Sequence, residues 1–131
     1  MVLESVKEIM VRSLVTATPS TPVRDVAKIM RGRNVGSVLI VDDSGKLVGI
    51  FTERDLVKVV AEGGSLDDPV EKYMTRNLVV AHEGEPLAKI ASKMLEHWVR
   101  HIPVVDDSGK PIGIVSIRDV LRHLLASCLF P

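Results

Sequence analysis

The hexapeptide VDDSGK stands at Val41–Lys46 and again at Val105–Lys110, an offset of 64 residues. With that offset, residues 6–60 align with residues 70–124 without a gap, and 20 of the 55 aligned positions are identical. A match of this extent at one fixed offset indicates an internal repeat. The fold is therefore decided by a unit of about 55–60 residues that occurs twice.

A polar stretch, Glu62–Pro69, joins the two copies, and its Gly, Asp and Pro residues favour a turn over a helix or strand. We therefore expect a first repeat over residues 1–64 and a second over residues 65–131, which together form one module. Two copies are too few for a solenoid. Because each copy is small for a self-sufficient core, we expect each half to supply core that the other half lacks.

The apolar pattern of one copy predicts the order strand, helix, strand, strand, helix, which is a mixed α+β fold. In the first copy, Leu14–Ala17 is β-prone, and a helix is expected to begin at Thr21, with Pro22 as its first helical residue. Two apolar runs around the VDDSGK loop predict a hairpin of buried strands, followed by a second helix from Thr52. The second copy repeats this pattern, with Leu78–Ala81 as its first strand. Short helical turns are expected at residues 6–10 and 70–74.

The composition argues against several functional classes. The chain of 131 residues carries 17 Lys and Arg and 17 Asp and Glu residues, so it lacks the cationic excess of a nucleic-acid-binding protein. No apolar run approaches the ~20 residues that span a bilayer, so we expect no membrane partner. The single cysteine, Cys128, rules out an internal disulfide and fits a reducing, cytoplasmic location, although its own role is left open.

Two segments could carry ligand chemistry, Gly49–Asp55 and Gly113–Asp119. In each, a strand ends at a hydroxyl residue and an Asp follows three positions later. As a bare pattern this is a capping box, which indicates a helix start far more often than a ligand site. The same groups also suit a nucleotide, because a helix N-terminus attracts phosphate and an Asp can accept both hydroxyls of a ribose. The glycine before them leaves room for a backbone or a ligand.

Other residues are less informative. Arg54 and Arg118 could meet a phosphate, but a solvated arginine on a first helical turn is the more ordinary interpretation. Trp98 stands where the first copy has Asn34, and it either fills a gap between repeats or lies on a dimer surface. The apolar tail Leu121–Pro131 suggests packing against a partner helix. No metal site is expected, because the histidines lack the spacing of a ligand set; they are His82, His97, His101 and His123.

The repeated unit resembles the cystathionine-β-synthase (CBS) domain, and the chain resembles a stand-alone tandem CBS pair. No single motif is specific, but the ordered set, present twice at constant spacing, is highly specific. The resemblance rests on Thr16 followed by Pro22, Ala27 and Met30, on VLIVDDSGKLVGIFTERD at Val38–Asp55, and on HIPVVDDSGKPIGIVSIRD at His101–Asp119.

This resemblance implies a fold and a ligand class. CBS pairs, which some schemes class as α/β, pack sheet against sheet about a pseudo-two-fold axis and leave two clefts. Those clefts commonly bind adenine nucleotides, often AMP. Two pairs commonly associate through their helices, so a homodimer is implied here.

The resemblance also implies a set of nucleotide-binding residues. The hydroxyl and carboxylate of the family motif map onto Thr52 and Asp55 in one cleft and onto Ser116 and Asp119 in the other. A basic pair that holds phosphates in some members maps onto Arg100 and His101, which align with Gly36 and Ser37 in the first copy, so we slightly favour the Ser116/Asp119 cleft. The adenine pocket maps onto Thr16, Ala17, Thr18, Val38, Val80, Ala81, His82, Ile102 and Pro103. Arg118, the possible phosphate contact noted above, completes the set of candidate nucleotide-binding residues.

The leading hypothesis is therefore an energy-sensing regulatory module that binds an adenine nucleotide, most simply AMP, with ADP or ATP as variants. A separate enzyme or transporter would be the regulated partner, and no catalytic cofactor is expected. The alternatives are binding of S-adenosylmethionine or another adenosyl ligand, or a dimerisation scaffold with unoccupied clefts. An enzyme is not expected, because the sequence offers no nucleophile–base pair and no metal set.

Overall fold

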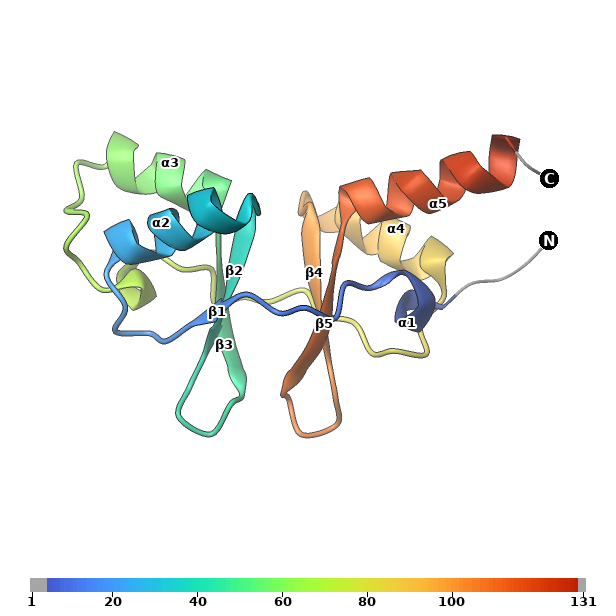
Figure 1. Ribbon diagram of the computed structural model, residues 1–131, viewed down its shortest axis with the longest axis horizontal. Helices are drawn as coiled ribbons and strands as arrows, with labels where there is room; N and C mark the ends of the chain where they lie inside the picture. Colours follow the sequence, from blue (N-terminus) through green and yellow to red (C-terminus); the bar gives the residue numbers. More distant parts are fainter. Residues whose placement is uncertain (1–4, 130–131) are drawn as a thin grey trace. The chain divides into compact units, whose positions relative to one another are not determined.

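The computed structural model describes the backbone of residues 5–129 and the side chains of residues 5–126. The chain forms two compact units, each of which combines helices with a small sheet (Figure 1). The first unit comprises Val15–Leu78, and the second unit comprises Met1–Leu14 together with Val79–Pro131. The mixed α and β architecture that the repeat pattern predicts is confirmed.

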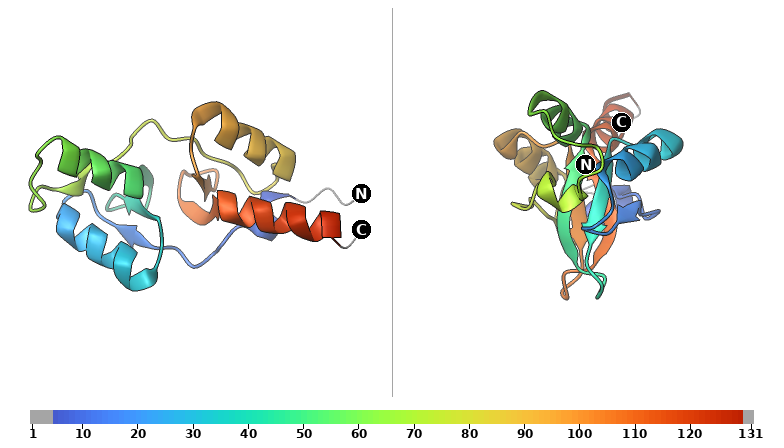
Figure 2. Two further views of the ribbon diagram at one scale, coloured as in Figure 1. Left: turned by 90° about the horizontal axis from the view of Figure 1, so that it is seen from above. Right: turned by 90° about the vertical axis from the view of Figure 1, so that its left-hand side faces the viewer.

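The first unit contains a three-stranded sheet of β1 (Thr16–Ala17), β2 (Ser37–Val41) and β3 (Leu47–Thr52) in that order. The pairing of β1 with β2 is parallel, and the pairing of β2 with β3 is antiparallel. Two helices, α2 (Val23–Arg33) and α3 (Glu53–Ala61), lie side by side in this unit (Figure 2), and the 3₁₀ helix η1 (Val70–Lys72) follows them in the chain.

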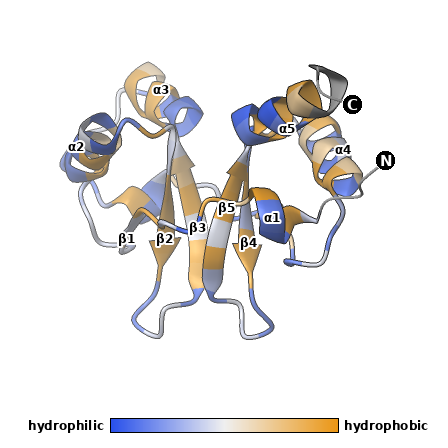
Figure 3. Cartoon of the chain, turned by 45° about the vertical axis from the view of Figure 1, so that its right-hand side comes forward, coloured by the Kyte–Doolittle hydropathy of each residue, from blue (hydrophilic) through white to orange (hydrophobic). Residues whose placement is uncertain are grey.

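The second unit contains the hairpin of β4 (His101–Val105) and β5 (Pro111–Ser116), which pair antiparallel. Its helices are the short α1 (Val6–Ile9), α4 (Leu87–His97) and α5 (Ile117–Leu129). The strands are mostly coloured as apolar residues, whereas the helices contain both polar and apolar residues (Figure 3). Within the described residues, no helix combines the length and the apolar character needed to span a bilayer.

The prediction of a strand at Leu78–Ala81 is wrong: only Ala81 remains, as an isolated parallel bridge to Val104. In the first unit, Leu39 N donates to the carbonyl of Val15 at 3.0 Å, which helps to hold the chain beside β2. The second repeat has Pro103 in place of Leu39. Because proline has no N–H, this ladder bond is lost and the first strand shortens to one bridge.

The helix starts are close to the predicted positions. Pro22 and Pro86 are the N-cap residues of α2 and α4, one residue later than the cap predicted at Thr21. One face of α2 is buried, and its Val23, Val26 and Met30 join the core of the first unit. The equivalent face of α4 joins the core of the second unit through Ile90 and Met94.

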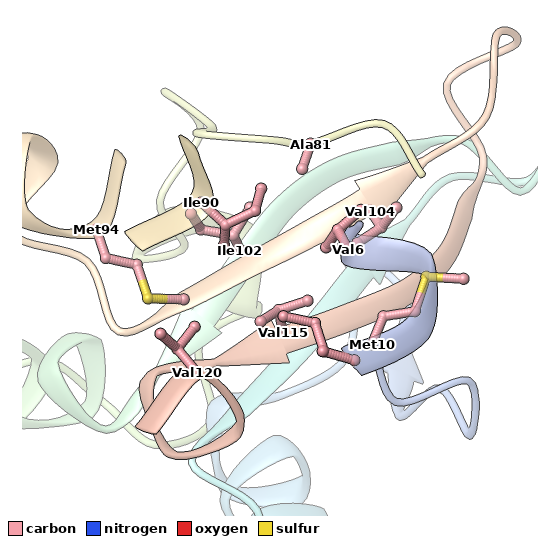
Figure 4. Packing of buried hydrophobic residues seen from close by; sticks show 10 residues of the cluster. Val6, Met10, Ala81, Ile90, Met94, Ile102, Val104, Val115 and Val120 are labelled. Atoms are coloured by element: carbon pink, nitrogen blue, oxygen red, sulfur yellow. The ribbon is translucent and has the colours of Figure 1, made fainter. Parts of the chain in front are cut away.

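The two sequence repeats exchange their first segments. The α1 residues Val6 and Ile9 and the C-cap residue Met10 belong to the first repeat, yet they are buried in the same core cluster of the second unit as Val104 and Val115. Figure 4 shows Val6 and Met10 in this cluster. In the same way, residues around η1 belong to the second repeat but pack into the core of the first unit; they are Val70, Tyr73 and Met74. Each repeat therefore supplies part of the other repeat's core.

The glycine of each motif provides the space for this exchange. A Cβ atom on Gly49 would lie 2.5 Å from the Sδ atom of Met74, and a Cβ on Gly113 would lie 2.6 Å from the Sδ atom of Met10. The space that the sequence interpretation left to a backbone or a ligand is thus filled by a methionine side chain. Any larger residue at either glycine would force the thioether to move.

Candidate functional site

The end of β3 and the start of α3 form the first candidate site. Thr52 is the N-cap of α3, and its backbone N–H donates to Oδ2 of Asp55 at 2.9 Å, while the N–H of Asp55 donates to Oγ1 of Thr52 at 3.4 Å. This is the reciprocal capping box that the pattern predicts. The Asp55 side chain is almost fully buried, with 3% of the residue exposed.

A third residue, which the sequence interpretation missed, completes this site. The Oγ1 hydroxyl of Thr75 donates to Oδ1 of Asp55 at 3.1 Å and lies 3.4 Å from its Oδ2. Two backbone hydrogen bonds with Ile50, of 2.8 and 3.0 Å, hold Thr75 beside β3. Both carboxylate oxygens of Asp55 therefore accept hydrogen bonds from the unit itself.

The end of β5 and the start of α5 form the second candidate site. The N–H and Oγ of Ser116 donate to Oδ2 of Asp119 at 2.8 and 3.0 Å, and the N–H of Asp119 donates to Oγ of Ser116 at 3.2 Å. Asp119 is also buried, with 7% exposed. Its Oδ1 lies 3.6 Å from Nη1 of Arg122, an exposed side chain.

The residue that corresponds to Thr75 is Val11, which also forms a bridge, with Ile114 at the edge of β5. Valine has no hydroxyl, so it cannot donate to Asp119. Among the described residues, Oδ1 of Asp119 consequently has no hydroxyl donor. A comparison of positions 11 and 75 is the sequence signal that could have found this difference.

Strand pairing brings the basic pair to the second site. His101 is opposite Ser116 in the β4–β5 register, and the carbonyl of Arg100 accepts from the N–H of Ile117 at 2.8 Å. The equivalent positions of the first unit are Gly36, whose carbonyl accepts from the N–H of Glu53, and Ser37. The second site therefore carries an arginine and a histidine where the first has neither.

The first turn of the helix adds to this difference in charge. α3 begins with Glu53, whereas α5 begins with Ile117, so the second site lacks one acidic residue. Both turns keep an exposed arginine at the next position, Arg54 and Arg118. The surroundings of Asp119 are thus more cationic than those of Asp55, which favours an anionic ligand there.

The residues expected to form an adenine pocket lie on β1, β2 and β4 and on the segments that follow β1 and precede α4, and several belong to the cores. Thr16 and Ala17 form β1, and the N–H of Thr18 donates to Oγ1 of Thr21 at 3.2 Å. The side chains of Val38, Ala81 and Ile102 belong to the core clusters of their own units, and Pro103 is buried in β4.

The backbone at Val80 and His82 is held by a charged cluster that sequence reasoning also missed. Nζ of Lys93 donates to the carbonyl of Val80 at 2.8 Å and to Oε1 of Glu85 at 2.6 Å, and the N–H of His82 donates to Oε2 of Glu85 at 2.6 Å. Burial raises the pKa of Glu85, but these hydrogen bonds, with a further one from Lys89, outweigh it and hold that pKa below its ordinary value.

Two further predicted features bear on the site only indirectly. Trp98 is exposed and caps the C-terminus of α4, and the side chains of Cys128 and of the end of the apolar tail lie outside the described residues. Among the residues that the structure describes, no three His, Cys, Asp or Glu side chains are placed to hold a metal ion.

Comparison with known proteins identifies the repeated unit. The family model of the CBS domain matches twice, at residues 6–62 and 70–126. The chain belongs to the CBS domain family. A 17.7 kDa protein from Acidianus ambivalens is 38% identical over 120 residues, which cover 92% of this chain and 73% of that protein.

Solved structures of CBS pairs share the fold. The CBS domain pair of protein MJ0100, in complex with 5'-methylthioadenosine and S-adenosyl-L-methionine, is 36% identical with a TM-score of 0.91, covering 96% of this chain and 99% of that one. The CBS domain protein PAE2072 from Pyrobaculum aerophilum, complexed with AMP, is 26% identical with a TM-score of 0.84, covering 93% and 98%. Homologous CBS pairs thus bind adenosine ligands.

Some relatives are enzymes, but the chain matches only a small part of them. The L-aspartate semialdehyde sulfurtransferase from Methanocaldococcus jannaschii is 38% identical over 117 residues, which are 89% of this chain and 22% of that enzyme. The shared portion is the CBS module.

Proposed function

We propose that this CBS pair is a regulatory module that binds an adenine nucleotide, with AMP as the preferred ligand and ADP or ATP as variants. The observation that carries the proposal is the buried carboxylate of Asp119 at the start of α5, with His101 on the paired strand β4 and Arg100 directly before that strand. The remaining predicted contacts, including Thr52 and Asp55 in the first unit, belong to the same proposal.

The chemistry of the second site matches the parts of a nucleotide. A carboxylate accepts hydrogen bonds from the two hydroxyls of a ribose, and charged acceptors make stronger bonds than neutral ones. The N-terminus of α5 and the side chains of Arg100 and Arg118 supply positive charge for a phosphate. The regulatory effect would follow from a difference in affinity between two states of the protein, since a ligand shifts an equilibrium only by that difference.

The local charge favours AMP over S-adenosylmethionine. S-adenosylmethionine carries a sulfonium cation and no phosphate, so the basic pair would repel part of it. AMP carries a phosphate dianion that the same pair attracts. The first site, with Glu53 and without a basic pair, lacks this preference.

Isothermal titration calorimetry tests the proposal, with AMP, ADP, ATP, S-adenosylmethionine and adenosine as separate titrants. We expect AMP to bind more tightly than adenosine, and Arg100→Ala to remove most of that advantage, about tenfold or more in Kd. Arg33→Ala, at the exposed C-terminus of α2, is the matched control and should change nothing. No heat with any of these titrants at millimolar concentration would contradict the proposal.

The homodimer implied by the resemblance is part of the proposal. Helices α3 and α5 expose apolar side chains at equivalent positions, Val57 with Leu121 and Val60 with Leu124, at 44–70% of their surface. Exposed apolar faces of this kind mark interaction surfaces. A separate regulated protein and a cytoplasmic location stay predictions of the sequence.

Light scattering coupled to size-exclusion chromatography tests the dimer. Leu121→Glu together with Val57→Glu should convert it to a monomer, whereas Leu95→Glu on α4, where Leu95 is 75% exposed, should not. If these α3 and α5 changes leave the dimer intact, its interface lies elsewhere. A dimer that binds none of the titrants above would instead favour the scaffold function.

A further inference from the structure

We infer that the two nucleotide sites are unequal because of one side chain. The Thr75 hydroxyl already donates a hydrogen bond to the carboxylate of Asp55, so the ligand's ribose binds first, and most tightly, at Asp119. This inference rests on the proposed function and specifies which of the two motifs carries it. The decisive position lies outside both motifs, in the segment that each repeat donates to the other.

In the first unit, a ribose must compete with hydrogen bonds that already exist. Asp55 accepts from the N–H of Thr52 and from Oγ1 of Thr75, so each of its carboxylate oxygens has a donor. A diol that took over Oδ1 would leave the Thr75 hydroxyl without its acceptor. The new hydrogen bond would then replace an old one, and little net free energy would be gained.

In the second unit, the corresponding exchange costs less. Oδ2 of Asp119 accepts from Ser116, but Oδ1 faces no hydroxyl among the described residues, because Val11 stands at the position of Thr75. The contact of Oδ1 with Arg122 is 3.6 Å long and involves a side chain that is 64% exposed. Exposed ion pairs of this kind contribute little, so a ribose hydroxyl can replace it.

The charge distribution around the two carboxylates independently favours ligand binding at Asp119. The second site has Arg100 and His101 where the first has Gly36 and Ser37, and it lacks the acidic residue that begins α3. A phosphate attached to the ribose would therefore be attracted to the site whose carboxylate is available. Both effects favour Asp119 over Asp55.

Calorimetry with AMP on the full chain tests the inference through two carboxamide variants. We expect about one tight AMP per chain in the unmodified protein. Asp119→Asn should weaken that event by about tenfold to a hundredfold, which is the usual effect of losing a hydrogen bond to a charged group. Asp55→Asn should leave the tight event within about twofold, because Asp55 is engaged by Thr75.

A reciprocal exchange at the donated positions isolates the role of Thr75. Val11→Thr places a hydroxyl beside Asp119 and should weaken AMP binding about tenfold, while thermal denaturation shows that the protein still folds. Thr75→Val releases Asp55 and should add a second, weaker binding event. Both variants preserve β-branching and the backbone bridges, so a general loss of structure is not expected.

The possible results separate the two ideas. If neither AMP nor any other adenosyl titrant binds, the proposed function fails and the inference fails with it. If AMP binds but Asp55→Asn, rather than Asp119→Asn, removes the tight event, the proposed function stands and the inference is overturned. Two equal AMP sites in the unmodified protein, or no response to either exchange at positions 11 and 75, would also overturn it.

Discussion

The first and second units start α3 and α5 with the same hydrogen bonds, but they surround the capping carboxylate with different residues. Thr52 with Asp55 and Ser116 with Asp119 form equivalent pairs, with N–H to Oδ2 distances of 2.9 and 2.8 Å. The differences lie at positions 11 and 75, 36 and 100, 37 and 101, and 53 and 117. The two repeats therefore share the hydrogen bonds that build the helix start and differ in the residues that surround the carboxylate.

The largest effects are expected where the two units are alike. Met74→Ala and Met10→Ala each remove a buried side chain that packs against a glycine of a strand, Gly49 or Gly113. Each change should lower the free energy of unfolding by about 2–5 kcal/mol, because a cavity remains in a small core. Urea denaturation measures the loss, and Leu95→Ala on the exposed face of α4 should cost less than about 0.5 kcal/mol.

Equal losses in the two methionine variants would show that the exchanged segments contribute symmetrically. If only one methionine variant loses stability, the two exchanged segments do not contribute equally to their cores. The two units would then differ in core packing as well as around their carboxylates.

The next effect should differ between the units. Asp55→Ala removes the carboxylate half of the capping box of α3 and leaves the Thr75 hydroxyl without an acceptor, so we expect the free energy of unfolding to fall by about 2–3 kcal/mol. Asp119→Ala removes the corresponding carboxylate of the α5 box and its contact with the exposed Arg122, so the free energy of unfolding should fall by about 1–2 kcal/mol. In a Thr75→Val background, the cost of Asp55→Ala should fall to that of Asp119→Ala, as a double-mutant cycle would measure. Equal costs in the unmodified background would contradict the role assigned to Thr75.

Much of the fold could be predicted because its signals are local and occur twice. The offset of 64 residues, the hairpins around VDDSGK and the caps at Thr52 and Ser116 all depend on neighbours within a few positions. The exchange of α1 and η1 could not be assigned, since a short apolar segment packs equally well, on pattern alone, against either repeat.

Among the site residues, the sequence predicts the capping pairs and the unequal basic pair, but it does not predict Thr75 or the charged cluster around Glu85. These depend on contacts across 20 residues, for Thr75, and 13 residues, for Lys93 with Val80. The loss of the second copy's first strand could have been predicted from the sequence, because Pro103 has no backbone N–H to donate to that strand. Roles toward a ligand remain predictions for every residue.

A smaller difference should appear in the pH dependence of stability. The second unit has Glu85, whose pKa is held below its ordinary value of 4.5, where the first has the uncharged Thr21. A carboxyl group whose pKa is lower in the folded protein than in the unfolded chain stabilises the fold at pH values above its unfolded-state pKa. This contribution is lost as the pH falls through the pKa of the folded state. Glu85→Gln should therefore be less stable than the unmodified protein at pH 7, and the gap should narrow below about pH 4.5.

Denaturation between pH 3 and pH 7 measures this gap. Asp42→Asn is a suitable comparison, since Asp42 lies in an exposed loop where hydrogen bonds from Ser44 and Lys46 lower its pKa, and its counterpart Asp106 is held in the same way. If the difference in the free energy of unfolding between Glu85→Gln and the unmodified protein does not change with pH, the charge of the Glu85 carboxylate does not contribute to stability.

The smallest effect concerns the ends of α2 and α4. Both helices end at a residue in the left-handed conformation, Asn34 with φ of 53° and Trp98 with φ of 55°. Asparagine tolerates this conformation, whereas an ordinary side chain pays a steric cost there. Trp98→Asn should raise the free energy of unfolding by about 0.5–1 kcal/mol, and Asn34→Trp should lower it by a similar amount. If Trp98→Asn destabilises the protein instead, the exposed indole makes contacts that outweigh its backbone strain.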